Sequence, residues 1–307
     1  MHLTVLSRSS ALYTTRRLVD AARIAGHRAR VIDPLRCEVY VAGGQSTLLY
    51  RRKPMPRTDA CIPRIGQSVQ TYGLAVLDQL ARLGVPLLNS SEAISRSRAK
   101  LSCLEHLSAQ GVPVPATVLA NDAREITEMV SMVGGCPVLI KLLHGAERTG
   151  VMVCETPQSM EAALEALLAL GHDVMVQEYV RDVKGRDLRA LVVGGRVVAA
   201  VRRRARVGRL ARTLGAGARF EGARLRPELA RLAERTAQLV GLEVAAVDML
   251  DGVGGPKVFE VISSPGIQEI EHATGVDVAR VIVERAAALA RARPKKKKGM
   301  AASHEQA

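Results

Sequence analysis

Residues 244–266 read VAAVDMLDGVGGPKVFEVISSPG, two apolar runs separated by a glycine-rich turn. Residues 244–250 and 258–261 have the composition of strands, and the turn between them predicts that the two strands pair as an antiparallel hairpin. Matching spacing on paired strands puts side chains on one face. We therefore expect Asp248 and Glu260 to converge, which suits a hard cation such as Mg²⁺. Two solvent-facing acids on an exposed strand are the alternative.

Two lysines upstream are candidates for phosphate binding. Lys100 lies in a helix predicted at about 92–110, and Lys141 ends an apolar strand at 137–141. A loop bracketed by Gly145 and Gly150 follows Lys141, and backbone amides in such a loop can face a phosphate. A strand-end lysine adds a point charge for the same ligand. Taken one at a time, each lysine is better explained as a solvated surface residue.

The rest of the chain alternates strands and helices, which predicts several lobes for 307 residues. Residues 1–95 show a strand–helix–strand pattern, as expected of a small α/β domain with a parallel sheet. A further strand-like run at 85–88 follows the second helix of this segment. Residues 96–180 and 181–292 each combine helices with hairpins, so we expect two α+β lobes. In the second lobe, Gly194 and Gly195 between β-rich runs predict a hairpin. Apolar periodicity, with Pro227 at the start and Gly241 just past the end, predicts a helix at 227–240. Residues 293–307 include four consecutive lysines without periodicity, and we expect a disordered basic tail.

Composition narrows the class of protein. The net charge of +14 attracts nucleotides, acidic peptides or RNA without choosing between them, and aromatic residues are scarce at 2%, which disfavours a base-stacking platform. No apolar run has the length of a membrane span, and the first residues do not form a secretory signal, so we expect no membrane contact and a cytoplasmic location. The five cysteines are scattered, as expected of buried free thiols.

The order of these motifs along the chain carries a family resemblance. Lys100, Lys141 before a glycine loop, the run Gln177-Glu178-Tyr179-Val180, Asp187-x-Arg189, and finally Asp248 and Glu260 before Ser264-Pro265-Gly266 follow one another in sequence. This order resembles the ATP-grasp ligases, and among them the RimK-type ligases that add glutamate to the C-terminus of a small-subunit ribosomal protein. The resemblance implies an ATP-grasp fold, α/β plus α+β, with an N-terminal pre-ATP-grasp domain that is Rossmann-like.

The resemblance also implies a role for each motif. Lys100 and Lys141 would hold ATP phosphates, and Mg²⁺ or Mn²⁺ would bind at the two carboxylates. The run Glu178, Tyr179 and Val180 would present backbone groups to adenine, with Glu178 or Asp187 meeting the ribose or the adenine amine. Metal-binding residues would be Asp248 and Glu260, and Arg203 would stabilise an oxyanion.

The implied reaction phosphorylates a carboxylate to an acyl phosphate, which an amine then attacks. The implied partners are ATP, an amino acid (glutamate), and the C-terminus of an acceptor protein or peptide, a ribosomal protein being one candidate. We also expect a homo-oligomer. The basic run that contains Arg203, namely Arg202, Arg204, Arg206, Arg209 and Arg212, is equally well interpreted as an exposed face for an acidic peptide or RNA.

Departures from the family pattern support a second hypothesis. Where the family has an Asn two residues after the second metal ligand, this chain has Ile262, and an alkyl group cannot bind a metal. Ala211 and Thr213 stand where the family has an Arg and an Asn that contact the nucleotide. The alternative is therefore a catalytically impaired relative that binds nucleotide and acts as a regulator or scaffold. A basic RNA-binding accessory protein is a third hypothesis, supported by charge alone.

Overall fold

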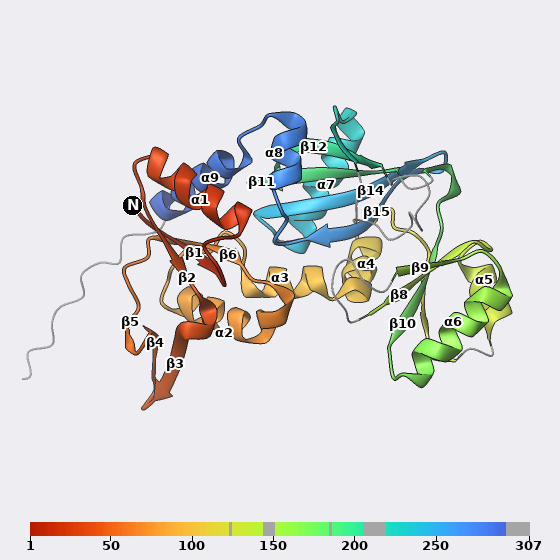
Figure 1. Ribbon diagram of the computed structural model, residues 1–307, viewed down its shortest axis with the longest axis horizontal. Helices are drawn as coiled ribbons and strands as arrows, with labels where there is room; N and C mark the ends of the chain where they lie inside the picture. The colour runs from red at the N-terminus through yellow and green to blue at the C-terminus, as the bar shows by residue number, and fades with distance from the viewer. Residues whose placement is uncertain (123–124, 144–150, 184–185, 205–218, 293–307) are drawn as a thin grey trace, which may run out of the picture.

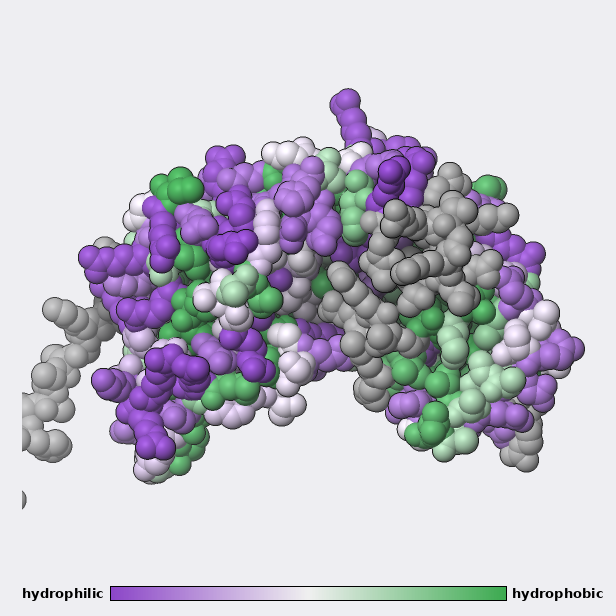
Figure 2. Space-filling view, viewed as in Figure 1, coloured by the Kyte–Doolittle hydropathy of each residue, from purple (hydrophilic) through white to green (hydrophobic). Residues whose placement is uncertain are grey.

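The computed structural model describes residues 1–122, 125–143, 151–183, 186–204 and 219–292. In these ranges the strands form four sheets, with the N-terminal domain and the sheet of β8, β9 and β10 at opposite ends of the long axis (Figure 1). None of the helices in these ranges has both the length and the apolar character that crossing a membrane requires. Hydrophilic and hydrophobic residues are interspersed over the face of the N-terminal domain in Figure 2.

The N-terminal domain contains the expected parallel sheet, in the order β2-β1-β6. Its elements are β1 (His2–Ser7), α1 (Tyr13–Ile24), β2 (Arg28–Ile32), β6 (Ala60–Arg64) and α2 (Gln70–Arg82). The predicted strand–helix–strand unit is confirmed, because α1 connects β1 to a parallel β2. The strand-like run at 85–88 contributes a single bridge from Leu87 to Cys61 instead of a strand.

A second small sheet in this domain went unpredicted. β3 (Cys37–Ala42), β4 (Gln45–Tyr50) and β5 (Lys53–Pro54) form an antiparallel sheet in that order. Gly43 and Gly44, with φ of 56° and 74°, make the tight turn between β3 and β4. Two glycines between β-rich runs correctly predicted the hairpin at Gly194 and Gly195. Gly43 and Gly44 give the same sequence signal for the β3–β4 hairpin.

The helix predicted at 92–110 divides at Ala99 into two helices, and an antiparallel sheet follows them. The elements are α3 (Ser91–Arg98), α4 (Lys100–Ala109), β7 (Thr117–Ala120), α5 (Ile126–Met132), β8 (Val138–Leu142), β9 (Val151–Cys154), α6 (Pro157–Ala169) and β10 (Val174–Glu178). The sheet order is β7-β10-β8-β9, and α5 and α6 pack against it. Lys100 is the first residue of α4, and Lys141 is the penultimate residue of β8.

The largest sheet has the order β13-β12-β11-β14-β15. Its strands and flanking helices are β11 (Arg186–Val193), β12 (Arg196–Arg204), β13 (Arg219–Gly222), α7 (Pro227–Val240), β14 (Val244–Gly252), β15 (Gly255–Ile262), α8 (Gln268–Thr274) and α9 (Val278–Ala292). The predicted helix at 227–240 is confirmed, with Pro227 at its first turn and Gly241 ending it at φ 84°. α8, β7 and β13 were not predicted.

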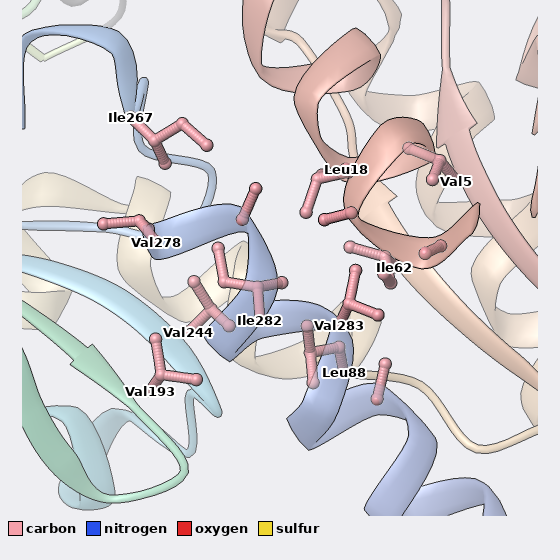
Figure 3. Close-up of a cluster of buried hydrophobic side chains, with 14 of the residues drawn as sticks. Val5, Leu18, Ile62, Leu88, Val193, Val244, Ile267, Val278, Ile282 and Val283 are labelled. Carbon is pink, nitrogen blue, oxygen red and sulfur yellow. The ribbon is translucent and has the colours of Figure 1, made fainter. Parts of the chain in front are cut away.

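One apolar core joins the N-terminal domain to the largest sheet. Figure 3 shows Ile282 and Val283 of α9 between Leu18 and Ile62 on one side and Val244 on the other. Each of these side chains is at most 5% exposed. The C-terminal helix is therefore shared by both parts of the molecule, and its burial fixes the N-terminal sheet against the sheet that carries Asp248.

Asn89 makes a polar connection between the same two parts. Its amide nitrogen donates to the carbonyl oxygens of Val244 and Ser263, at 2.8 and 2.9 Å, and its amide oxygen accepts from the backbone nitrogens of Glu243 and Val244. The side chain is 3% exposed. All four hydrogen-bonding positions of the amide are thus used to hold the starts of β14 and of the segment after β15.

Candidate active site

The predicted convergence of the two carboxylates is confirmed. Asp248 on β14 is directly opposite Glu260 on β15, so both side chains lie on one face of the sheet. The Asp248 side chain is completely buried, whereas Glu260 is partly exposed. The alternative of two solvent-facing acids is therefore wrong for Asp248.

Two arginines on neighbouring strands contact the buried Asp248 carboxylate. Arg189 on β11 donates from Nε to Oδ1 and from Nη2 to Oδ2, both at 2.7 Å. Arg203 on β12 donates from Nη2 to the same Oδ2 at 2.7 Å, and from Nε to Asp187 Oδ1. Cross-strand pairing of Arg189 with Asp248 and of Arg203 with Asp187 aligns the four side chains on one face. The result is a buried network of two carboxylates and two guanidinium groups.

This network controls the charge of its acids. Burial alone would raise the pKa of Asp248, but the adjacent Arg189 and Arg203 outweigh it, so its pKa lies below the ordinary value and the group is ionised. Burial raises the pKa of Asp187, and the nearby Asp248 charge acts in the same direction, against the opposing effect of Arg203. Asp187 Oδ2 is buried without a hydrogen-bond partner among the described residues. That oxygen is available to accept a hydrogen bond from a ligand.

Lys141 comes from a different sheet and lies near enough to the same carboxylates for their charges to affect its pKa. It is 7% exposed, donates from Nζ to Gln177 Oε1 at 2.6 Å, and lies 5.4 Å from the centre of the Phe259 ring on β15. Burial lowers the pKa of Lys141 to about 8; Glu260 and Asp248 oppose that shift, and Lys100 adds to it. The pKa of Glu260 is raised, first by burial and then by Asp248. The two lysines that were predicted to bind phosphate and the two predicted metal ligands therefore lie close enough to influence the pKa of Lys141.

A pocket of about 210 Å³ opens beside these groups, between α3, the start of α4 and β15. Lys100, Glu260 and Ile262 are among the residues that line it. Ile262 is two residues after Glu260 on β15, so it lies on the same face, and it is 8% exposed. The position at which the family pattern calls for an amide is thus an apolar part of the pocket wall.

The predicted adenine-binding run lies where β10 approaches β15. Both carboxylate oxygens of Glu178 accept from Lys257 Nζ at 2.6 Å, and one also accepts from the backbone nitrogen of Ala116. Tyr179 and Val180 follow the last ladder pair of β10, so their backbone groups lie outside the strand pairing. The Glu178 side chain thus links β10 to β15, and the backbone groups of Tyr179 and Val180 have no partner in the strand pairing of β10.

The basic run around Arg203 divides into two environments. Arg203 is buried in the network, whereas Arg202 and Arg204 are exposed, and Arg204 pairs with Glu221 at 3.4 Å. The interpretation of this run as a solvent-facing binding surface therefore does not hold for Arg203. Arg206, Arg209 and Arg212 lie outside the described residues, as do Ala211, Thr213, the glycine loop at 145–150 and the tail at 293–307.

The donor set fits a magnesium ion that is bound together with phosphate oxygens. No group of three or more His, Cys, Asp or Glu side chains among the described residues could hold a metal by itself. Mg²⁺ is commonly bound through one or two carboxylates, with substrate phosphates and water completing its shell. Asp248 and Glu260 supply that number of carboxylates, although each Asp248 oxygen also has a guanidinium partner.

Sequence reasoning assigned no role to three residues that the structure places in the site. Arg189 binds Asp248, Gln177 accepts from Lys141, and Lys257 binds Glu178. The even spacing of Asp187 and Arg189 on one strand was a usable signal for the first, because it puts both on one face. The partners of Gln177 and Lys257 depend on how strands pair and sheets pack, which local spacing does not reveal.

Comparison with known proteins gives a consistent result. The RimK-like ATP-grasp domain matches residues 97–286, and the RimK PreATP-grasp domain matches residues 1–94. A probable alpha-L-glutamate ligase of Azotobacter vinelandii is 45% identical, over 92% of this chain and 94% of the relative. Another, from Chromohalobacter salexigens, is 43% identical, over 97% of this chain and 100% of the relative.

Solved structures agree on the fold. The ATP-grasp ligase PsnB complexed with minimal precursor has a TM-score of 0.76 at 22% identity, over 94% of this chain and 98% of that chain. A RimK domain ATP-grasp protein from Sphaerobacter thermophilus has a TM-score of 0.72 at 22% identity, over 93% of this chain and 99% of that chain. The expected fold, ATP-grasp with an N-terminal pre-ATP-grasp domain, is confirmed, and the chain belongs to the RimK-like ATP-grasp family.

Proposed function

We propose that this protein is an ATP- and Mg²⁺-dependent carboxylate–amine ligase that adds glutamate to the C-terminus of a protein or peptide. The observation that carries the proposal is the convergence of Lys100, Lys141, Asp248 and Glu260 from separate elements. Phosphoryl transfer depends on positioning and charge stabilisation. The two lysines can stabilise the negative charge of the phosphates, and the two carboxylates can position Mg²⁺. Relatives named probable alpha-L-glutamate ligase support the choice of glutamate.

On the nucleotide side, each group has a distinct task in this proposal. Lys141 and Lys100 hold phosphates, and Tyr179 and Val180 present backbone groups to adenine. Asp187 accepts a ribose hydroxyl at Oδ2, the buried oxygen without a partner among the described residues. Glu178 is already held by Lys257, so we assign the ribose contact to Asp187 and a supporting role to Glu178.

On the reacting side, Asp248 and Glu260 hold Mg²⁺, which when bound neutralises charge on the phosphate oxygens. Arg203 is fixed by Asp187 and Asp248 from two directions. A guanidinium held in this way costs little reorganisation when it stabilises the oxyanion formed as the amine attacks the acyl phosphate. Arg189 is a positioning residue, because it orients the Asp248 carboxylate through two hydrogen bonds.

A second candidate function is nucleotide binding without efficient catalysis. The observation that favours it is Ile262, an alkyl side chain in the pocket wall next to Glu260. With no oxygen at this position, Mg²⁺ has one protein ligand fewer. Such a protein would bind ATP and an acidic partner, and act as a regulator or scaffold.

The test is to incubate the protein with ATP, Mg²⁺, glutamate and acceptor peptides of different C-terminal sequence. Mass spectrometry should detect peptides extended by glutamyl residues, with one ADP formed per residue added. Glu260→Gln should abolish extension, whereas the matched change Glu228→Gln, at an exposed acid on α7, should leave the rate unchanged. ATP binding without ADP formation for any acceptor would favour the second candidate.

Ile262→Asn separates the two candidates further. In a working ligase the added amide oxygen should lower the Mg²⁺ concentration that gives half-maximal rate. In an impaired relative the single change should leave turnover undetectable. Titrating Mg²⁺ into the ATP complex by calorimetry gives a readout that does not depend on turnover, and there the variant should bind the ion more tightly in either case.

A further inference from the structure

A second pocket lies at the end of β11 that is remote from the candidate active site. It has a volume of about 620 Å³ and is bounded by the β11–β12 turn, one face of α7 and a side chain of α9. Asp187 of the buried network is near the start of β11 and the turn at Gly194 follows its end, so about 20 Å of strand separates them. The two pockets share no lining residue among those described, so this pocket is a separate site.

Arginine dominates the charge of this second pocket. Among the described residues, four arginines and two glutamates line it: Arg196, Arg231, Arg235, Arg285, Glu234 and Glu243. Two positive charges therefore remain unbalanced. The volume is also within the range of about 300–1,000 Å³ that is typical of sites for small molecules.

Both glutamates of the pocket are already held by other groups. Glu243 accepts from Arg285 Nε and Nη2, at 2.7 and 2.9 Å. Glu234 accepts from the backbone nitrogen of Val197 at 3.0 Å, and Arg196 lies 3.7 Å from its other oxygen. These contacts direct the two carboxylates to α9 and β12, away from the remaining two arginines of the pocket.

Those two arginines, Arg231 and Arg235, lie one turn apart on the exposed side of α7. Arg235 donates to the backbone oxygen of Gln110, whereas the Arg231 side chain has no hydrogen bond or ion pair with any described residue. Like charges at this spacing repel each other and destabilise a helix. A bound anion would remove that repulsion, so the pair favours an anionic ligand.

The wall opposite α7 is held in place by contacts between three elements. The backbone nitrogen of Gly194 donates to the backbone oxygen of Glu243 at 2.8 Å, which ties the β11–β12 turn to the start of β14. Arg285 of α9 packs against the same turn, since a Cβ on Gly194 would lie 3.0 Å from its Cδ. The pocket is therefore formed before any ligand enters, as small-molecule sites usually are.

We infer that this pocket binds a small phosphomonoester. Such a group carries a charge of about −1.5 to −2 at pH 7 and has three strong acceptor oxygens, which matches the two unbalanced guanidinium groups. Gln238 lines the pocket one turn beyond Arg235, so its amide can donate to the same phosphate. A single carboxylate would balance only one of the two charges. The space beside Gly195 and Leu242 is left for the organic part of the molecule.

Titration calorimetry of the full chain with glycerol 3-phosphate tests the site. We expect saturable binding of one molecule, at least about tenfold weaker in Arg231→Gln, which loses a charged donor, and in Gln238→Glu, which adds a negative charge. Dimethyl phosphate, with a single charge, and uncharged glycerol should bind more weakly by about the same factor. Lys141→Met should leave the dissociation constant of glycerol 3-phosphate unchanged, because Lys141 belongs to the other site.

A matched pair of double variants separates this site from the overall positive charge. Arg231→Gln with Arg235→Gln removes both unbalanced charges of the pocket. Arg23→Gln with Arg82→Gln removes two charges from exposed positions on α1 and α2. Only the first double variant should lose binding, and circular dichroism should show that both keep the wild-type secondary structure.

Four results would overturn the inference. One is the absence of saturable binding at about 10 mM glycerol 3-phosphate, since even millimolar sites fill at that concentration. Equal weakening in the two double variants would assign the binding to overall charge, and its loss in Lys141→Met would assign it to the active site. Tighter binding of a glutamate-rich peptide, weakened by Arg231→Gln, would assign the pocket to an acidic protein segment. These titrations contain no ATP, glutamate or acceptor, so their outcome is independent of the proposed ligase activity.

Discussion

Removing Arg189 should destabilise the protein strongly, because Asp248 is completely buried beneath it. In Arg189→Met, Asp248 Oδ1 loses the hydrogen bond from Nε, and Oδ2 retains only the one from Arg203. Two hydrogen bonds to a charged group, each contributing about 1.5–3 kcal/mol, are lost. Leaving one buried charge without its partner typically costs about 3–5 kcal/mol, and we expect a loss in that range.

Urea denaturation followed by circular dichroism measures the loss, since the chain has no tryptophan to report by fluorescence. Arg226→Met is the matched control. Arg226 contacts Glu228 and Asp251 at 2.7 and 2.8 Å, but its side chain is 57% exposed, so we expect a change of about 0–1 kcal/mol. Equal losses in the two variants, or a loss below about 1 kcal/mol for Arg189→Met, would refute the argument that burial gives this ion pair its energetic importance.

Acid should reduce the difference between Arg189→Met and the wild type. Burial disfavours the Asp248 carboxylate, yet Arg189 and Arg203 lower its pKa below the unfolded value of about 3.9. The stability that Asp248 contributes is therefore present above that pH and is lost as the pH falls through the lower pKa of the folded state. A difference in unfolding free energy that stays constant from pH 7 to pH 3 would contradict this assignment.

Three further predictions follow from individual contacts. Burial lowers the pKa of Lys141 to about 8, and its ammonium form is the one that binds phosphate. The affinity for ATP should therefore fall about tenfold between pH 7 and pH 9. Calorimetry should show this fall in the wild type and not in Lys141→Met. Asn89→Leu should lower the unfolding free energy by at least about 3 kcal/mol in urea denaturation, since three buried backbone groups and one part-buried group lose their partner. A loss under about 1 kcal/mol would show that water replaces the amide. Gly73→Ala should cost about 1–3 kcal/mol despite the better helix former, because its Cβ would lie 2.8 Å from Ile65 Cγ2; an unchanged thermal midpoint would mean that Ile65 can move.

The local sequence pattern was sufficient to predict most helices and strands, and to predict the pair of carboxylates in the site. The helix at 227–240 was predicted from apolar periodicity with Pro227 and Gly241 at its ends, and the structure has the same bounds. The pairing of Asp248 with Glu260 was predictable because the two residues are twelve apart across one tight turn. At that separation, strand alternation and turn chemistry are enough to specify which side chains meet.

The remaining elements show where local pattern failed. The β3–β4 hairpin has the same double-glycine signal as the hairpin at 194–195. The sequence therefore contained enough information to predict it, although it was not predicted. The run at 85–88 has the composition of a strand, but in the structure it forms a single bridge, from Leu87 to Cys61. Strand formation there depends on a partner, which composition does not supply.

The sequence by itself determined the hairpins, the capped helices and the pair of carboxylates, all of which depend on contacts between residues close in the chain. The tertiary structure alone decided that Lys141 of one sheet lies against Phe259 of another, and that Arg189 and Arg203 bind Asp248. These partners are 118, 59 and 45 residues apart. Contacts at such separations depend on how whole sheets pack, and no local periodicity encodes that packing.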